Sequence, residues 1–344
     1  MNITNLRSLS IEQLLELKSN VIMDQFSEKP SSSYTLIQFY KLLYRKLKQD
    51  RTNQYRELVN ETKGDLIHAL IQYGSYLKME GQKDLLMARD CLQKALQIDR
   101  NLPIAHYRIG FIAYQEKRYD EALFHFHQAL SIRDRTVDKK YALNERQKRY
   151  AKLYFINCSL HLATELNETL DSFDDEIEPL PGYDFSPYFD MIHRNEQYLG
   201  AHKIVTSEGE TICLKDEIDE YLEQDNTIVL YFSDYGNLLC YNGNERMLHI
   251  NGAELLRYLL LYGKSTRPVT MRDLTDLIST RQTNEQNNDA YRQAIRRLRN
   301  KFEEIGLSRQ FIQSKSFDGI PGYYYTGDIP FTIIHRPDVD FILP

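Results

Sequence analysis

The feature that most constrains the fold of this chain is a repeat within its first half. Residues 69–100 align with residues 105–134, and small and apolar side chains recur between the two copies. Ala88, Leu92, Ala95 and Ile98 return 34 positions later as Ala122, Phe126, Ala129 and Ile132, and Gly74 returns after 36 positions as Gly110. A repeated unit of this length cannot bury its apolar face alone, so stacked copies must share one core.

The second copy resembles a tetratricopeptide repeat. It has the small residues of that family at Gly110, Ala122 and Ala129, with Tyr-Asp-Glu at the turn, residues 119–121. Short side chains at these positions let the two helices of a unit approach closely. The resemblance implies an all-α helical solenoid, which we place at residues 1–170.

Stacked helix pairs form a curved surface whose concave groove suits a peptide. Segments 34–49 and 145–170 have helical apolar spacing without the full pattern, as end units often do. Candidate groove residues lie on the first helix of the second copy: His106, Arg108 and Tyr114. Two alternatives remain open, because such an array also serves as a spacer or as a surface that pairs two copies of a chain.

A run rich in acids and prolines follows the repeats. Residues 171–190, DSFDDEIEPLPGYDFSPYFD, show neither a helical nor a strand period. This composition indicates a linker, which we place at residues 171–200. A further hypothesis is that the carboxylates of residues 171–178 shield a basic helix near the C-terminus, and charge complementarity is its one support.

The periodicity changes from helix to strand after the linker, which predicts a second domain over residues 201–330. Four short strand-like runs are separated by turn sequences. They cover residues 202–206, 210–214, 227–232 and 236–241. Residues 331–344 remain as a C-terminal tail.

Three helices and a hairpin are predicted after the strands. The first helix has Asn251 as its expected cap and ends at Gly263. The second begins at Thr270, and the third covers residues 289–305. Residues 310–327 contain a Gly/Pro turn between two strand-like runs, the pattern of a β-hairpin.

Three motifs in this region resemble the C-terminal effector domain of OmpR-type response regulators. The first-helix signature is matched by residues 248–256, the recognition-helix run by residues 295–301, and the Gly-Tyr that closes the wing by residues 322–323. The resemblance implies an α+β winged-helix domain that binds duplex DNA in the major groove, and a bacterial protein. The predicted fold class is therefore multidomain, an all-α solenoid followed by a winged helix. Helical repeats take the place of the family's receiver domain, so a peptide, a protein partner or self-association is the expected input.

The third helix concentrates positive charge in a chain whose net charge is −6. At about 100° per residue, its apolar side chains form one stripe that must face the core: Tyr291, Ala294, Ile295, Leu298, Phe302 and Ile305. Basic and amide side chains are predicted on the other side and its flanks: Arg292, Gln293, Arg296, Arg297, Arg299, Asn300 and Lys301. Arginine suits guanine edges, Gln and Asn suit adenine, and flanking cations suit phosphates.

The resemblance makes Arg297 the expected base contact and gives Arg299 and Lys301 backbone or structural roles. Lys315, near the tip of the hairpin, stands in for the arginine with which family wings commonly enter the minor groove. Asp318 beside it is unfavourable near phosphate. An ordinary solvated amphipathic helix remains the alternative to a DNA-reading one.

No motif for catalysis or metal binding is found in the sequence. The four cysteines include no Cys-x-x-Cys pair, and there is no Gly-rich phosphate loop or nucleophile–base motif. No apolar run approaches the roughly 20 residues of a membrane span, and the N-terminus lacks a signal-peptide pattern. We therefore expect a cytoplasmic protein that is not an enzyme, does not contact a membrane, and has neither cofactor nor metal.

These observations predict a transcription regulator. Its expected partners are double-stranded DNA and a peptide or protein bound by the array, and the need for a second protomer stays open. The alternative is a scaffold that uses both domains to bind proteins. The arginines of the third helix favour DNA, because a protein interface would more often centre on aromatic side chains. The sequence leaves open the operator, the sign of regulation, the ligand of the array and the oligomeric state.

Overall fold

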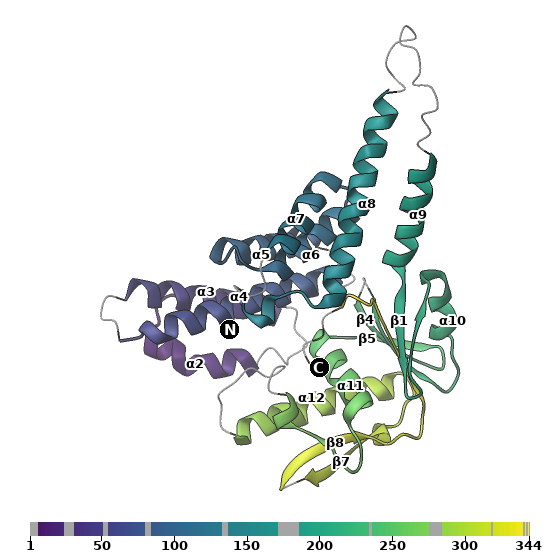
Figure 1. Ribbon diagram of the computed structural model, residues 1–344. Coiled ribbons are helices and arrows are strands. Elements are labelled where there is room, and N and C mark those ends of the chain that lie inside the picture. Colours follow the sequence, from purple (N-terminus) through teal and green to yellow (C-terminus); the bar gives the residue numbers. More distant parts are fainter. Residues whose placement is uncertain are drawn as a thin grey trace.

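A computed structural model describes residues 6–23, 31–50, 54–79, 84–132, 137–170, 186–233, 236–274, 284–317, 319–339, 341 and 343 (Figure 1). The first part of the chain is helical, and the second combines helices with two β-sheets. The expected order, a helical region followed by a mixed one, is therefore confirmed.

The helical region is an array whose members pack in chain order. Its helices are α2 (Ile11–Met23), α3 (Ser31–Gln49), α4 (Arg56–Met79), α5 (Leu85–Ile98), α6 (Pro103–Gln115), α7 (Tyr119–Ser131), the short 3-10 helix η3 (Lys139–Tyr141), α8 (Glu145–Leu170) and α9 (Ser186–Gly200). Each α-helix contacts the next one along the chain. Their buried faces form one continuous core, and α8 and α9 extend together away from the rest (Figure 1).

The two glycines of the repeat lie where the paired helices approach each other closely. A Cβ on Gly74 of α4 would lie 3.0 Å from the Leu92 side chain in α5. A Cβ on Gly110 of α6 would lie 3.0 Å from the Phe126 ring in α7. Leu92 and Phe126 are the residues that the repeat equates, so both helix pairs cross at the same point of the unit. The close crossing explains why each copy needs the smallest residue there.

Local signals set several helix starts. Ser10 and Gln13 form a capping box before α2, with Gln13 N–H donating to Ser10 Oγ at 3.2 Å and Ser10 N–H to Gln13 Oε1 at 2.9 Å. Asp84 caps α5 by accepting from Met87 N–H at 2.8 Å. Pro103 begins α6, where its missing N–H leaves no donor unpaired.

The segment expected as a linker is helical over its second half. Residues 171–185 lie outside the described residues, and the carboxylates proposed to shield the basic helix lie among them. From Ser186 the chain forms α9, which packs along α8. Ile192 and Leu199 are its buried side chains, and their seven-residue spacing places them on one face. This face makes α9 an additional member of the array.

A six-stranded sheet begins the second part of the chain. Its strands are β1 (His202–Thr206), β2 (Glu210–Cys213), β3 (Ile228–Ser233), β4 (Gly236–Tyr241), β5 (Asn244–Leu248) and β9 (Phe331–His335), in the order β2-β1-β9-β3-β4-β5. The four predicted strand-like runs correspond to β1 to β4. Neighbouring strands are antiparallel except β3 and β9, which are parallel. The 3-10 helix η4 (Lys215–Glu217) and α10 (Ile218–Leu222) connect β2 to β3.

The expected C-terminal tail differs most from the structure, because it supplies a central strand. Ile334 of β9 lies opposite Ile204 of β1 on one side and Tyr231 of β3 on the other. All five residues of β9 are buried. A short strand buried on both faces lacks the polar–apolar alternation of a half-buried one, which is why its pattern did not predict a strand.

A three-stranded sheet of order β6-β8-β7 lies beyond the first sheet in the chain. The elements in this part are α11 (Ile250–Tyr262), β6 (Val269–Thr270), the 3-10 helix η5 (Met271–Leu274), α12 (Asn284–Glu304), the 3-10 helix η6 (Arg309–Phe311), β7 (Ile312–Phe317) and β8 (Ile320–Tyr325). β7 and β8 form the predicted hairpin. Of the helix expected from Thr270, the structure describes only residues 270–274. Thr270 is the last residue of β6, and residues 271–274 form η5.

The first helix of this part is capped by a neighbour of the expected residue. The N-cap of α11 is His249, and its Nδ1 accepts from the N–H of Asn251, the predicted cap, at 3.4 Å. Gly263 ends the helix as predicted. One core joins α11 and α12 to both sheets, so the position of α12 is determined by the whole second part of the chain.

Candidate nucleic-acid interface and surfaces of the helical array

Helix α12 is held in place by its apolar stripe. Five of the six predicted stripe residues are buried and Ala294 is half-buried. Tyr291 adds a specific anchor, because its hydroxyl donates to the Val269 carbonyl at 2.9 Å. The Tyr291 ring also meets the Tyr323 ring of β8 edge-on, with 5.0 Å between centroids. These contacts set the rotation of α12 about its axis, and with it the residues that face outward.

Four of the exposed polar side chains of α12 form what we call the basic strip: Arg292, Gln293, Arg296 and Asn300. Three acids of the same helix, Asp289, Glu303 and Glu304, are exposed as well. Arg292 pairs with Asp289 at 2.9 Å, but both side chains are more than half exposed, so the pair contributes little and exchanges readily with solvent. Asn300 Oδ1 accepts from Arg309 Nη2 at 2.8 Å. Arg296 forms no ion pair with any residue that the structure describes.

Arg297 lies on the flank of α12 and not in the basic strip. The residue is half-buried, and its Nη1 is buried without a hydrogen-bond partner within the described ranges. Burial, followed by the charge of Arg297, lowers the pKa of His249 to about 4. The guanidinium is therefore close to the N-terminus of α11, and not in the outward position expected for a base contact.

Arg299 connects α12 to the hairpin. Its Nε and Nη2 both donate to the Ile312 carbonyl, at 3.2 and 2.6 Å. Its guanidinium lies 5.7 Å from the centroid of the Tyr323 ring. Lys301 is half-buried and pairs with Glu304 on the same helix at 3.3 Å. Of the two roles expected for Arg299, contact with the DNA backbone and structural support, these contacts agree with the structural one.

A groove of about 330 Å³ separates the start of the basic strip from the hairpin. Arg292 lines one side, and Lys315 and the neighbouring hairpin residues line the other. Lys315 is exposed and its Nζ donates to the Ser265 carbonyl at 3.0 Å. Two cations thus face one hollow that is open to solvent. Asp318 lies outside the described residues.

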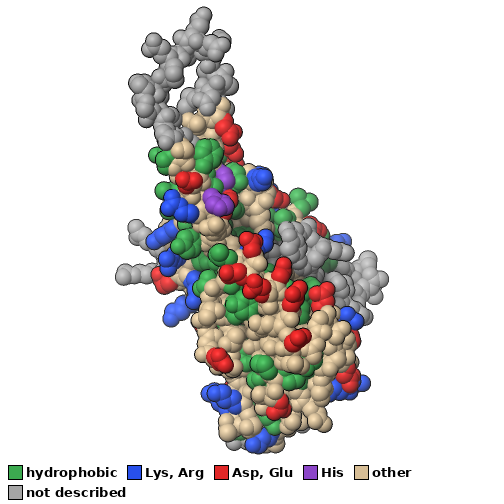
Figure 2. All heavy atoms as spheres, turned by 90° about the vertical axis from the view of Figure 1, so that its right-hand side faces the viewer, with side chains coloured by type: hydrophobic (Ala, Val, Ile, Leu, Met, Phe, Trp, Pro, Cys, Tyr) green, Lys and Arg blue, Asp and Glu red, His purple; other side chains and the backbone are tan. Residues whose placement is uncertain are grey.

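Acidic side chains gather on a different face of the molecule. Figure 2 shows them across the middle of the face that carries α8, α9 and the six-stranded sheet. The exposed acids of this region include those of η4, α10 and the turn that follows: Asp216, Glu217, Asp219, Glu220, Glu223 and Asp225. This part of the surface is therefore strongly acidic, whereas on α12 the exposed acids Asp289, Glu303 and Glu304 lie beside the cations of the helix.

The three candidate groove residues of the array do not lie together. His106 is half-buried, and its Nδ1 is 3.0 Å from Nδ1 of His125 on α7. Arg108 reaches the other way, and its Nη1 donates to the Ile71 carbonyl of α4 at 3.2 Å. Tyr114 faces α8, where its hydroxyl accepts from Asn157 Nδ2 at 2.6 Å. One groove containing all three is therefore absent from the described structure.

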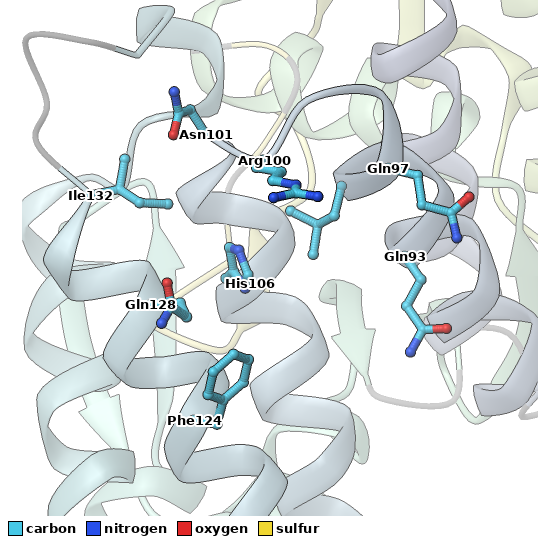
Figure 3. A pocket seen from close by; sticks show the side chains of 9 residues that line it. Gln93, Gln97, Arg100, Asn101, His106, Phe124, Gln128 and Ile132 are labelled. Atoms are coloured by element: carbon cyan, nitrogen blue, oxygen red, sulfur yellow. The ribbon is translucent and has the colours of Figure 1, made fainter.

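His106 lines a pocket of about 640 Å³ between α5, α6 and α7 (Figure 3). Gln93 and Gln97 project from α5, and Phe124 and Gln128 from α7. The pocket thus combines amide groups with an exposed aromatic ring. Burial lowers the pKa of His106 and lowers that of His125 to about 4, so His106 and the histidine that it contacts are neutral near pH 7.

The opposite side of α6 contacts the segment after β9. Residues 336–339, which we call the C-terminal turn, close with a hydrogen bond from Val339 N–H to the Arg336 carbonyl at 3.1 Å. The Arg336 guanidinium lies 4.4 Å from the centroid of the Phe111 ring and donates to the Tyr154 hydroxyl at 2.7 Å. This contact between the two parts of the chain was not predicted. Its one sequence signal is Pro and Asp after an apolar run, a turn pattern.

The described residues include no group of three or more His, Cys, Asp or Glu side chains arranged to hold a metal ion. Cys91, Cys158, Cys213 and Cys240 are buried thiols. Burial raises the pKa of Cys91 and Cys240 to about 11 and of Cys158 to about 12. Within the described ranges, no helix has the length and apolar character needed to cross a bilayer.

Comparison with known families places a tetratricopeptide repeat at residues 103–135. This match contains α6 and α7 and supports the protein-interaction character of the array. No curated protein and no solved structure matches the chain.

Proposed function

We propose that the chain is a DNA-binding transcription regulator whose second part is an OmpR-type winged helix. The order of elements supports this assignment: a preceding sheet, α11, a short strand, α12 and the β7–β8 hairpin, with β6 pairing to β8 as the third strand of a small sheet. The observation that carries the proposal is the basic strip, two arginines and two amides exposed on the side of α12 away from a stripe of mostly buried apolar residues. A helix of these dimensions fits the major groove of duplex DNA.

We propose different roles for the cations of α12 according to their exposure. Arg296 is the proposed base contact, because it is exposed near the centre of the basic strip, between Gln293 and Asn300. An arginine can donate two hydrogen bonds to guanine, and the two amides can bracket adenine. Arg292 and Lys315 face the groove beside the hairpin and are the proposed phosphate contacts, which supply affinity and register.

The helical array is the proposed docking site for a protein or peptide partner. The tetratricopeptide match at residues 103–135 supports this half of the proposal. The basic strip favours DNA over a purely protein-binding scaffold, because it contains no aromatic side chain and protein interfaces usually centre on aromatic anchors.

Selection of bound fragments from random duplexes, with the full chain as bait, tests the DNA half. We expect one enriched sequence, and an affinity for it that falls steeply between about 50 and 200 mM salt. Arg194→Ala on α9 is a matched control, since it removes an exposed arginine far along the chain from the strip. Failure to retain any duplex at about 50 mM salt would favour the scaffold instead.

A further inference from the structure

The C-terminal turn is bound by the array through a set of specific contacts. The Arg336 guanidinium lies against the Phe111 ring of α6 and donates to the Tyr154 hydroxyl of α8. Behind these rings, Phe126 of α7 stacks on Tyr154 with 5.0 Å between centroids and 4° between planes. The Phe111 ring and the Tyr154 hydroxyl thus form a binding site for one cation, which we call the seat, and Phe126 supports the Tyr154 ring.

The same site holds a carboxylate. Arg336 Nε and Nη2 pair with the two oxygens of Asp338 at 2.9 and 3.1 Å, and the Tyr107 hydroxyl donates to Asp338. Burial, followed by the charge of Asp338, raises the pKa of Tyr107 well above its ordinary value. The hydroxyl therefore keeps its proton and remains a donor. Arg336 and Asp338 are only 8% and 7% exposed, so these are desolvated contacts.

Side chains of the array also donate hydrogen bonds to the backbone of the C-terminal turn. Gln147 Nε2 donates to the Asp338 carbonyl at 3.4 Å, and Arg146 Nη1 to the Pro337 carbonyl at 3.4 Å. Both donors lie at the start of α8. The array therefore contacts a cation, an anion and two carbonyl groups of one short segment.

The seat belongs to the array and not to the turn. Tyr107, Phe111, Phe126 and Tyr154 are members of the core of the helical region. The residues that follow the turn are anchored elsewhere, because Leu343 is buried in the core of the second part and Phe341 packs against it. Each side of the contact is thus stabilised by its own core. We therefore expect the seat on the array to keep its structure when the C-terminal turn does not occupy it.

We propose that this face of the array is a recognition site for β-turns that carry arginine and aspartate two positions apart, and that residues 336–339 are its intramolecular occupant. The partner is a protein that presents the same Arg-x-Asp turn and replaces the chain's own. The inference rests on the docking half of the proposed function and is independent of DNA binding.

The chemistry of the seat excludes simpler partners. An apolar segment would offer no acceptor to the buried hydroxyl of Tyr107, and the loss of a buried hydrogen bond is costly. A segment with only the arginine or only the aspartate would bury one charge without its counterion. The occupant in the same chain also competes at a high effective concentration, so a partner must match its contacts.

The test uses a fluorescent, disulfide-closed peptide with the sequence Cys-His-Arg-Pro-Asp-Val-Cys and the full-length chain. In the double variant Arg336→Ala/Asp338→Ala the chain's own turn loses its side-chain contacts, and we expect the peptide to bind at least about tenfold more tightly than to the unmodified chain. Adding Tyr107→Phe to the double variant removes one hydroxyl from the seat and should weaken peptide binding again. A peptide with its Asp replaced by Ala is the matched control.

Two results would overturn the proposal: equal affinity of the peptide for the unmodified chain and the double variant, or equal binding of the control peptide. If far-ultraviolet circular dichroism shows that the double variant has lost helix, Asp338→Asn is the second variant, and the same increase in peptide affinity is required of it. DNA affinity is measured on the unmodified chain in parallel. If the peptide does not bind but DNA does, this inference alone is rejected. If the peptide binds but DNA does not, only the proposed DNA-binding function is rejected.

Discussion

Arg299 of α12 and Ile312 of β7 are joined by two hydrogen bonds, from Nε and Nη2 of the guanidinium to one carbonyl oxygen. This pair ties the helix that carries the basic strip to the adjacent hairpin. The hairpin therefore cannot change its angle to the helix without breaking a charge-assisted contact in a half-buried position.

Replacement Arg299→Ala should destabilise the second part of the chain by about 1–2 kcal/mol, because a partly buried carbonyl loses charged donors. Urea unfolding followed by circular dichroism measures the change. Arg309→Ala is the control, since Arg309 is exposed and its pair with Glu303 is a surface pair, for which about 0–1 kcal/mol is expected. Equal losses in the two variants would remove the structural role from Arg299.

Replacement Arg296→Ala should reduce affinity for the selected duplex by about 1–3 kcal/mol and relax the preference at one base pair. Arg296 is exposed at the centre of the basic strip, whereas Arg297 is half-buried on the flank. Fluorescence anisotropy on the selected duplex and on single-base variants measures both effects. A larger loss of preference from Arg297→Ala than from Arg296→Ala would reverse this assignment.

Replacement Arg292→Ala should weaken binding to all duplexes by a similar factor and reduce the salt slope by about 1, as loss of one phosphate contact does. Its ion pair with Asp289 is largely exposed, so little stability should be lost. The measurement is a titration of the same duplexes over a salt series. An altered base preference in this variant is the outcome that the phosphate role does not allow.

Replacement Gly110→Ala should destabilise the array by about 1–3 kcal/mol, because the new methyl group would lie 3.0 Å from the Phe126 ring and the crossing would be overpacked. Gly64→Ala on α4 is a matched control, since nothing lies within 4 Å of its Cβ position. Alanine favours a helix interior over glycine by about 1 kcal/mol, so the control should be stabilised. Thermal unfolding of both variants decides the sign, and stabilisation at Gly110 would contradict the close crossing.

The free energy of unfolding should fall as the pH is lowered from about 6.5 to about 4. Burial lowers the pKa of His125, His249 and His335 from 6.5 to about 4. Between these values the unfolded chain binds protons that the folded chain does not, so acid favours unfolding, by about 1.4 kcal/mol per pH unit for each histidine. Above pH 6.5 these three groups are neutral in both states and contribute no slope.

Urea midpoints at pH 7, 6 and 5 measure this dependence. A variant in which exposed His127 is replaced by Asn should retain the whole slope, because His127 lies on the outer side of α7. The variant His335→Asn should have a shallower slope than the unmodified chain. A slope that is the same in both variants would show that the buried ring of His335 does not take part.

Several elements could be predicted from the sequence because their signals are local. The repeat located Gly74 and Gly110 at the close crossings, and the helical period located the buried stripe of α12. The position of Arg297 required finer geometry. At about 100° per residue it lies about 110° from the centre of the stripe, whereas Gln293, Arg296 and Asn300 lie about 150–170° away. A flank residue is exposed or covered according to its neighbours, and the neighbour here, His249, is remote in the sequence.

The C-terminal turn could not be predicted for a similar reason. Arg336 and Asp338 would be ordinary surface charges in a tail, and only the rings of Phe111 and Tyr154, more than 180 residues earlier, make their burial favourable. Sequence periodicity describes which face of an element is apolar. It carries no information on which distant element will meet a charged side chain.

The central place of β9 also affects how the chain acquires its structure. The β1–β2 and β3–β4–β5 segments are local antiparallel units, but β9 alone joins β1 to β3. The six-stranded sheet therefore stays in two pieces during synthesis until residues 331–335 have emerged from the ribosome. Because contacts over such separations form slowly, insertion of this strand should be a late, rate-limiting event, and chaperones would meet a nascent chain whose repeats are folded while its sheet is still divided.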